Sequence, residues 1–399
     1  MLWQPELSEH YHNLSEQQLG EQISARRAML GSKLLILGHH YQRDEVIRHA
    51  DLIGDSLKLS RMAAAEAPKR GARFIIFCGV HFMAETADIL TPNDVQVILP
   101  DLSAGCSMAD MADYDDALTA WELIAAAHGT DAVRVIPITY VNSSAAVKAF
   151  VGERGGACCT SGNAREVFEW AAQGGNEPLR EHERVQVLFM PDQYLGRNTA
   201  RMRGLRSELD AERGRGRADM ALWNPKKPLG GLTREMIREV SVLLWAGHCS
   251  VHKLFRAEHV AQARHRDPNT TVIVHPECCQ EVVELADEVG STEFIIERVQ
   301  QAPTGSSWTI GTEVHLVDRV CRAAAARGVS ARILSDCQCL CTTMVRIDQR
   351  HLLWVLDNLA EGRVVNRIQV HAEAAALARR GLERMLALRP PAPATAILD

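Results

Sequence analysis

The sequence lacks a hydrophobic run that could cross a membrane, since no stretch of about 18 apolar residues occurs among its 399 positions. It also lacks a basic excess, because 44 Lys and Arg are outnumbered by 50 Asp and Glu, giving a formal net charge of −6. That balance argues against a nucleic-acid-binding protein, whose electrostatic footprint is basic. The polar first 30 residues contain no apolar core of a secretory signal. We therefore expect a cytoplasmic protein without nucleic-acid or membrane partners.

No strand-like segment runs into G-x-G-x-x-G, which disfavours a dinucleotide-binding dehydrogenase. Hydrophobic residues make up 46 % and charged residues 24 % of the chain, as in ordinary globular proteins. This composition excludes a disordered chain, a collagen and a coiled-coil rod. The length predicts two or three domains.

What the sequence does contain is an alternation of short apolar runs with longer helical patterns. Strands are expected at 33–38, 74–78, 95–99, 133–140, 185–190, 242–245, 271–275 and 294–296. Helices are expected at 15–30, 44–50, 57–65, 115–128, 163–174, 234–244, 257–266, 313–327 and 371–387. Continuous apolar strands separated by amphipathic helices indicate parallel α/β units.

A weak internal repeat groups these units into three. Three strands run into polar signatures, LGHHYQ at 37–42, TYVNSS at 139–144 and VHPECC at 274–279. Three later strands are followed by Cys106, Cys249 and Cys341. Ligands of open α/β sheets collect beyond the carboxyl ends of the strands. We therefore expect three αβα domains with small parallel sheets, related by a pseudo-three-fold axis around one central site.

The domains are expected at 1–115, with a helical N-terminal extension completed by C-terminal helices, and at 116–250 and 251–345. The last segment, 346–399, is expected to contain C-terminal helices and to end in a loose Pro/Ala-rich tail at 389–399. An Arg-rich segment at 196–230 is expected to be a loop inserted in the second domain. We favour a solvated surface loop there over a lid that attracts anions.

The eleven cysteines point to metal or redox chemistry, because clustered cysteines in a large cytosolic chain seldom form structural disulfides. Three thiolates holding an iron–sulfur cluster leave one iron open, and an open metal polarises carbonyl or hydroxyl groups. Cys106, Cys249 and Cys341 are the candidate ligands. The alternative is a zinc-stabilised or thiol-switch regulatory protein built around the C-x-C-x-C of Cys337, Cys339 and Cys341.

Ten motifs in order between about residues 35 and 344 resemble the quinolinate synthase family, the A protein of bacterial NAD biosynthesis, in a form with a long N-terminal extension. They are LGHHYQRDEV, ADLIGDSLKLS, FCGVHFMAETADIL, DLSAGCSMAD, YVNSSAAVKA, CTSGNA, PDQYLGRNTA, GHCSVH, HPECCQEVVELADEVGSTEFII and GTE.

The resemblance implies an enzyme that condenses iminosuccinate (iminoaspartate) with dihydroxyacetone phosphate to quinolinate, phosphate and water. It implies three α/β domains that share a [4Fe–4S] cluster through Cys106, Cys249 and Cys341, with an aspartate-oxidising enzyme supplying iminosuccinate. Relatives often carry C-x-x-C-x-x-C with a regulatory disulfide near the last ligand. Because this chain has C-x-C-x-C, a redox switch through Cys337 and Cys339 is not assigned.

The resemblance also implies the substrate site. The positions matching iminosuccinate contacts are His39, Ser56, Tyr140, Asn142, Ser161, His275, Glu277 and Thr292. Tyr41, His39 and Glu277 are the expected catalytic residues. Hydroxyl and imidazole donors suit a dicarboxylate, and Glu277, Tyr41 and a histidine suit repeated proton transfer. A different [4Fe–4S] hydro-lyase is the alternative within the same chemistry.

Overall fold

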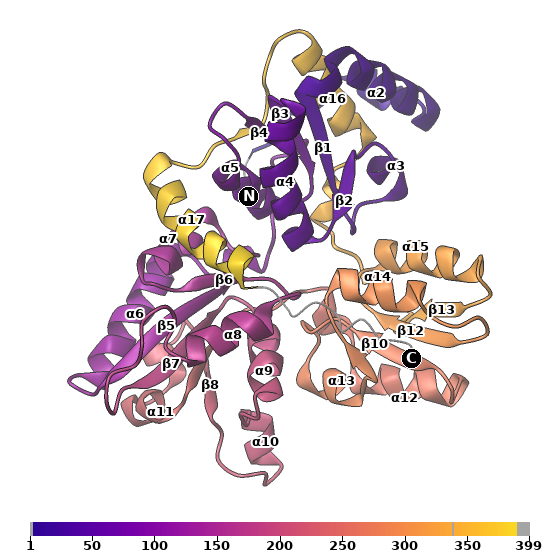
Figure 1. Ribbon diagram of the computed structural model, residues 1–399. Coiled ribbons are helices and arrows are strands. Elements are labelled where there is room, and N and C mark those ends of the chain that lie inside the picture. The colour runs from indigo at the N-terminus through magenta and orange to yellow at the C-terminus, as the bar shows by residue number, and fades with distance from the viewer. Residues whose placement is uncertain (1–2, 337–338, 389–399) are drawn as a thin grey trace, which may run out of the picture.

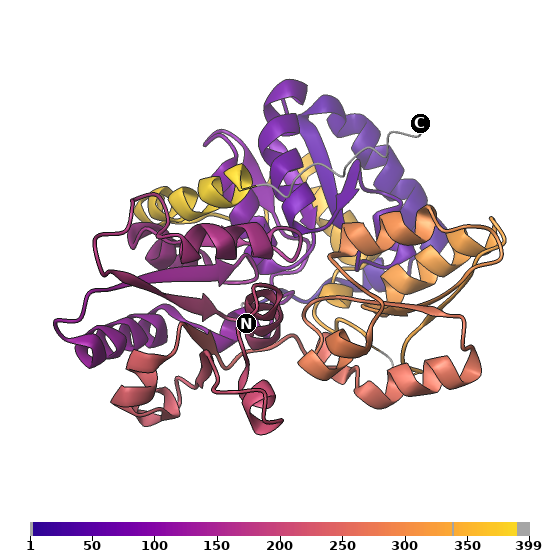
Figure 2. The same ribbon diagram turned by 60° about the horizontal axis from the view of Figure 1, so that its bottom comes forward.

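The computed structural model describes residues 3–336 and 339–388, which form three lobes around a common centre (Figure 1). Each lobe holds one small sheet, and helices cover both faces of the sheet in the second and third lobes (Figure 2). The fold is therefore α/β with three αβα units, as the sequence predicts. No helix in the described part of the chain is long and apolar enough to cross a membrane.

The first lobe lies at the top of Figure 1 and contains a five-stranded sheet. Its parallel strands are β2 (Leu52–Gly54), β1 (Leu34–His39), β3 (Phe74–Cys78) and β4 (Gln96–Ile98), and β14 (Arg367–Ile368) is antiparallel to β4. Its helices are α1 (Glu9–His12), α2 (Glu16–Leu30), α3 (Asp44–Ile47), α4 (Ser56–Arg70), α5 (His81–Leu90) and α16 (Gln349–Ala360). Every residue of β1 is buried, which explains its uninterrupted apolar run.

The second lobe has a parallel sheet with helices from both the middle and the end of the chain. The strands are, in order, β6 (Ala157–Cys159), β5 (Val133–Tyr140), β7 (Arg184–Met190), β9 (Val242–Trp245) and β8 (Met220–Trp223). The helices are α6 (Tyr114–His128), α7 (Ala145–Glu153), α8 (Ala164–Ala172), α9 (Gln193–Met202), α10 (Glu208–Glu212) and α11 (Arg234–Glu239). The C-terminal helix α17 (Ala372–Ala387) packs mainly against α7 and β6 of this lobe, and it also contacts α5 of the first lobe.

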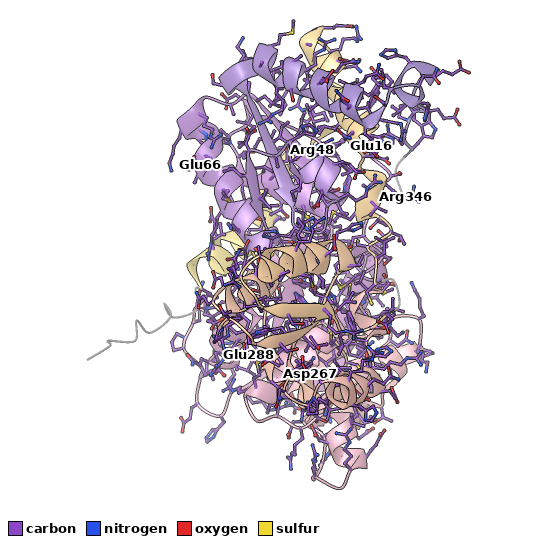
Figure 3. The ribbon with its side chains drawn as sticks, turned by 90° about the vertical axis from the view of Figure 1, so that its right-hand side faces the viewer. Glu16, Arg48, Glu66, Asp267, Glu288 and Arg346 are labelled. Atoms are coloured by element: carbon purple, nitrogen blue, oxygen red, sulfur yellow. The ribbon has the colours of Figure 1, made fainter. Side chains whose placement is uncertain are left out.

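The third lobe is the smallest and faces the viewer in Figure 3, which labels Asp267 and Glu288 on it and Glu16, Arg48 and Glu66 on the first lobe. Its parallel strands are β11 (Glu288–Val289), β10 (Thr271–Val274), β12 (Ser307–Gly311) and β13 (Ser330–Ile333). Its helices are α12 (Ala257–Arg266), α13 (Gln280–Leu285), α14 (Thr292–Gln300) and α15 (Val314–Ala325).

The three sheets repeat one strand order. The order of hydrogen-bonded strands is β2-β1-β3-β4 in the first lobe, β6-β5-β7-β9 in the second and β11-β10-β12-β13 in the third. The polar signatures follow the second strand of each series, and the cysteines follow the fourth. The carboxyl ends of these equivalent strands therefore present matching residues to one centre, which is the three-fold arrangement that the repeat predicts.

Two predicted elements are wrong. Residues 196–230 are not a loop, because they include the end of α9, α10 and β8, which pairs with β9 at the sheet edge. This insertion lengthens the chain between Cys106 and Cys249. Residues 294–296 form no strand but belong to α14, whose N-cap Ser291 accepts a hydrogen bond from the Phe294 N–H. The expected tail at 389–399 lies outside the described residues.

Candidate active site

One pocket lies where the three lobes meet, and all twelve predicted site residues line it. Each lobe contributes four of them: His39, Tyr41, Ser56 and Cys106 from the first, Tyr140, Asn142, Ser161 and Cys249 from the second, and His275, Glu277, Thr292 and Cys341 from the third. These residues are up to 302 positions apart in the sequence, so only the three-lobed topology brings them together.

Hydroxyl groups reach the pocket from the residues that follow the edge strands. Ser56 is the first residue of α4, whose N-cap Asp55 accepts a 2.9 Å hydrogen bond from the Lys58 N–H. Thr292 is the first residue of α14. Ser161 follows β6 in the second lobe. Helix N-termini favour negative charge, so two helix starts and three hydroxyls suit this wall to an anionic ligand.

Glu277 holds a buried carboxylate between two lobes. Its Oε1 accepts a 2.6 Å hydrogen bond from the Tyr140 hydroxyl, and its Oε2 lies 3.0 Å from Nδ1 of His252. Burial alone would raise the pKa of Glu277, but the imidazoles of His252 and His275 and the Tyr140 hydroxyl outweigh it and lower the pKa to about 2. The carboxylate is therefore ionised when no ligand is bound.

His252 was not predicted as a site residue, yet it lines the pocket. Its ring stacks on His275 with the centroids 4.3 Å apart, and its Nε2 lies 3.2 Å from Oγ1 of Thr312. Burial, followed by the nearby His252, lowers the pKa of His275 to about 3, so His275 is neutral. The available signal was the motif GHCSVH, which places this histidine three residues after Cys249.

His39 and Tyr41 form a second polar pair beside Thr292. Burial lowers the pKa of His39 to about 3, and the Tyr41 N–H donates to His39 Nδ1 at 3.1 Å. The neutral ring therefore carries its proton on Nε2. The Tyr41 hydroxyl lies 3.2 Å from Oγ1 of Thr292 and 3.0 Å from Oγ1 of Thr312, and burial raises its pKa well above the usual value. Tyr41 is thus a protonated hydroxyl that can donate.

The three pocket cysteines are partly buried thiols near one another. Burial raises the pKa of Cys106 to about 12, and Cys341 adds to this rise. Burial also raises the pKa of Cys249 well above its usual value, with further contributions from Glu277, Cys341 and Cys106. Such thiols stay protonated until a cation binds and displaces the proton. The Cys249 N–H donates to Oδ2 of Asp192 at 3.1 Å, which fixes the backbone of this cysteine.

Comparison with known proteins gives a consistent result. The model of the Quinolinate synthetase A protein family matches residues 21–387. This chain belongs to the quinolinate synthetase A family. A protein of Acidobacterium capsulatum is 49 % identical over 381 residues, covering 96 % of both chains. One from Streptomyces coelicolor is 49 % identical over 94 % of this chain and 89 % of its own. One from Corynebacterium glutamicum is 49 % identical over 98 % of this chain and 92 % of its own, and all three are named quinolinate synthase.

The donor set of this family member fits an iron–sulfur cluster. Among the described residues, the cysteines that line the pocket are Cys106, Cys249 and Cys341, one from each lobe. Three thiols without a fourth would leave one iron open to a ligand. Apolar side chains such as Val80, Phe82 and Met344 complete the wall around them.

A single metal ion is the other possibility that the geometry offers. One ligand atom each from Cys249, His252 and Glu277 lies within 4.8 Å of the others, a set that suits zinc. This arrangement would leave the thiols of Cys106 and Cys341 unused. It would also have to break the hydrogen bond between Tyr140 and Glu277 or share that carboxylate.

The C-x-C-x-C segment is only partly described. Cys337 lies outside the described residues, and Cys339 is buried but does not line the pocket. Cys341 is therefore the member of this segment that the structure places at the site. A redox switch through Cys337 and Cys339 stays untested.

Proposed function

We propose that this chain is a quinolinate synthase that condenses iminosuccinate with dihydroxyacetone phosphate to quinolinate, phosphate and water in NAD biosynthesis. The observation that carries the proposal is the single pocket in which three thiols meet hydroxyl, imidazole and carboxylate groups from all three lobes. Membership of the quinolinate synthetase A family supports the same reaction.

Cys106, Cys249 and Cys341 would hold a [4Fe–4S] cluster. With one iron free of protein ligands, such a cluster supplies a Lewis acid that assists loss of a substrate hydroxyl. The chain supplies the remaining chemistry through side chains whose protonation states the pocket fixes.

The hydroxyls of Ser56, Ser161 and Thr292 are suited to bind the carboxylates of iminosuccinate. None of the described residues lining the pocket is Lys or Arg. The site would therefore hold an anion through hydroxyl donors, the Nε2–H of His39 and the N-termini of α4 and α14. Neutral donors bind without a strong ion pair, which leaves the substrate free to change its charge during the reaction.

Glu277, Tyr140 and Tyr41 are suited to move protons. The condensation forms one carbon–carbon and one carbon–nitrogen bond and releases phosphate and water, so protons must leave carbon and nitrogen and reach the departing oxygens. The ionised Glu277 would accept a proton, while the Tyr140 hydroxyl and His252 hold its two oxygens in place. Tyr41, whose hydroxyl stays protonated, would donate.

Iminosuccinate would come from an enzyme that oxidises aspartate. The imine is unstable in water, so the supplying enzyme must act at the same place and time.

The test is product formation under anaerobic conditions. Purified protein is incubated with iminosuccinate, generated in the reaction from aspartate, and with dihydroxyacetone phosphate, and quinolinate is measured by mass spectrometry. Quinolinate that requires both substrates supports the proposal. No quinolinate, together with dehydration of another hydroxy acid, would assign the chain to a different [4Fe–4S] hydro-lyase.

A further inference from the structure

The segment PDQYLGRN at 191–198 lies beside the site but has no role in the chemistry described above. It forms the start of α9, which belongs to the second lobe and packs against α13 of the third lobe. None of the described pocket-lining residues comes from α9. Its buried polar side chains must therefore act on the protein rather than on a ligand.

Asn198 of α9 reaches across the lobe boundary to the backbone on both sides of Glu277. Its Nδ2 donates to the carbonyl oxygens of Pro276 and Cys278, both at 2.9 Å, and the residue is 2 % exposed. A primary amide nitrogen has two hydrogens, and this one uses both. Oδ1 makes no hydrogen bond to any described residue, so these two bonds alone orient the amide.

The N-cap residue of α9 is anchored at the other end of the site. Asp192, the N-cap of α9, accepts hydrogen bonds from the Leu195 N–H at 2.7 Å and from the Cys249 N–H at 3.1 Å. Helix α9 therefore connects the backbone of Cys249 to the backbone that carries Glu277. Both ends of this connection are buried, since Asp192 is 0 % exposed.

We infer that Asn198 is a positioning residue, which sets the place of the Glu277 carboxylate relative to Tyr140 by clamping residues 276–278 to the second lobe. Tyr140 ends β5 of the second lobe, whereas Glu277 follows β10 of the third. Their 2.6 Å hydrogen bond therefore requires the two lobes to keep a fixed position relative to each other. Asn198 fixes this position through its hydrogen bonds to the peptide groups that flank Glu277. The expected effect on catalysis rests on the proposed function, whereas the clamp between the two lobes does not.

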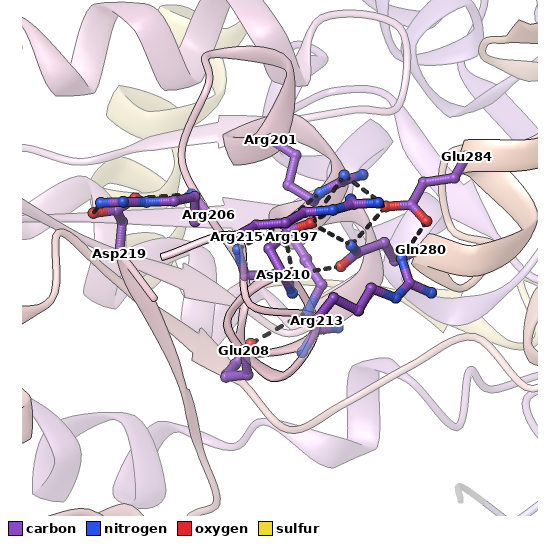
Figure 4. A network of polar contacts seen from close by, with 11 residues as sticks. Arg197, Arg201, Arg206, Glu208, Asp210, Arg213, Arg215, Asp219, Gln280 and Glu284 are labelled. Carbon is purple, nitrogen blue, oxygen red and sulfur yellow. Dashed lines mark hydrogen bonds and ion pairs between the residues drawn. The ribbon is translucent and has the colours of Figure 1, made fainter. Parts of the chain in front are cut away.

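A polar network outside the clamp joins the same two lobes (Figure 4). The Ser207 hydroxyl donates to Oε1 of Gln280 at 2.7 Å, and Arg201 and Arg213 each lie 2.6 Å from a carboxylate oxygen of Glu284. The Arg213 side chain is 35 % exposed, and screened ion pairs of this kind contribute little. Arg213→Gln therefore offers a matched control that breaks a lobe contact without touching residues 276–278.

The first test follows the backbone directly. Hydrogen–deuterium exchange of the peptide covering residues 275–279 is compared in the wild-type, Asn198→Ser and Arg213→Gln proteins. The Cys278 N–H donates to His275 O within this loop, so its exchange reports local opening. We expect at least about a tenfold faster exchange in Asn198→Ser and no change in Arg213→Gln. Unchanged exchange in Asn198→Ser would overturn the clamp, whatever reaction the enzyme catalyses.

The second test separates positioning from general support of the fold. A shift of about 1 Å in a reacting group lowers rates by up to about 100-fold, so we expect Asn198→Ser to reduce kcat about 30-fold with little effect on KM. In a Glu277→Gln background the same substitution should cost less than about threefold, because it acts through Glu277. Equal losses in both backgrounds would show that Asn198 only supports the fold.

Asn198→Gln covers the case in which the serine variant does not fold. It keeps both donors but moves them by one methylene group, so we expect a folded protein with kcat lowered at least about fivefold. A folded Asn198→Gln protein with wild-type kcat would contradict the inference. If the wild-type protein itself forms no quinolinate, the proposed function fails, and the exchange experiment alone decides on the clamp.

Discussion

The hydroxyl of Tyr140 in the second lobe donates a 2.6 Å hydrogen bond to the carboxylate of Glu277 in the third lobe. Both residues are at least 95 % buried, and a carboxylate without partners at such a place would be strongly destabilised. Within its own lobe Glu277 has the imidazoles of His252 and His275, and the second lobe adds the Tyr140 hydroxyl. The site is therefore a property of the assembled lobes, and substitutions that weaken this contact test the account.

Tyr140→Phe removes the hydroxyl and leaves the Glu277 carboxylate with His252 as its hydrogen-bonding partner and His275 close by. Loss of one partner of a buried charged group costs about 1–3 kcal/mol, so we expect kcat to fall about tenfold or more while the protein stays folded. Steady-state quinolinate formation and thermal unfolding measure the two effects. A Tyr140→Phe enzyme with wild-type kcat would remove Tyr140 from the proton path.

The three pocket cysteines are expected to be required for iron. Cys106→Ser, Cys249→Ser and Cys341→Ser should each lower iron and sulfide content and reduce activity at least about 100-fold, because serine replaces thiolate ligands poorly. Cys321→Ser is the control, since Cys321 lies on α15 and does not line the pocket. Full iron content in any of the three pocket variants would exclude that cysteine as a ligand.

A carboxylate at the boundary between the first and third lobes makes stability depend on pH. Glu293 of α14 lies 2.8 Å from Nε2 of His40 and 3.3 Å from Nζ of Lys58. Burial would raise the pKa of Glu293, but His40 and Lys58 outweigh it and lower the pKa to about 2 from its ordinary 4.5. The stabilisation is therefore present above pH 4.5 and is lost as the pH falls toward 2.

Glu293→Gln should consequently lower the free energy of unfolding at pH 7. Full burial would make this shift worth about 3 kcal/mol, and exposure to solvent reduces our expectation to about 1 kcal/mol. Urea unfolding at pH 7, 4.5 and 3 measures the difference between variant and wild type, which should shrink below pH 4.5. A difference that stays constant over this range would show that ionisation of Glu293 contributes nothing.

The C-terminal helix packs on the second lobe through a glycine. A Cβ atom at Gly152 of α7 would collide with the carbonyl oxygen of Leu377 in α17. We expect Gly152→Ala to destabilise the protein by about 2–3 kcal/mol, because neither backbone can move away. Gly20→Ala in α2 is the matched control, since its Cβ would have no atom closer than 3.5 Å. It should be neutral or stabilising by up to about 1 kcal/mol in the same thermal unfolding measurement.

The sequence predicts the central strands well because each of them is a largely apolar run. Strands β1, β5 and β10 are such runs, and their ends carry the polar signatures that the structure brings together. The edge strands β2, β6 and β11 have only two or three residues, too few for any periodicity. The residues 294–296 show the opposite failure, since three apolar residues in a helix look like a strand when taken alone.

The twelve predicted site residues were found through motifs, whereas His252 and Asn198 were not. His252 faces the pocket because a short turn follows Cys249, and its place in the motif GHCSVH was the one sequence signal for it. The partners of Asn198 lie 78 and 80 positions further along the chain. Contacts between lobes of this kind depend on tertiary structure, which local patterns do not contain.

The measurement that tests the central claim most directly is one anaerobic preparation analysed for iron, sulfide, zinc and quinolinate formation. Our account predicts about four irons and four sulfides per chain, together with quinolinate from iminosuccinate and dihydroxyacetone phosphate. A colourless protein that contains one zinc and forms no quinolinate would contradict it. That result would move the metal from the three thiols to Cys249, His252 and Glu277 or to the C-x-C-x-C segment.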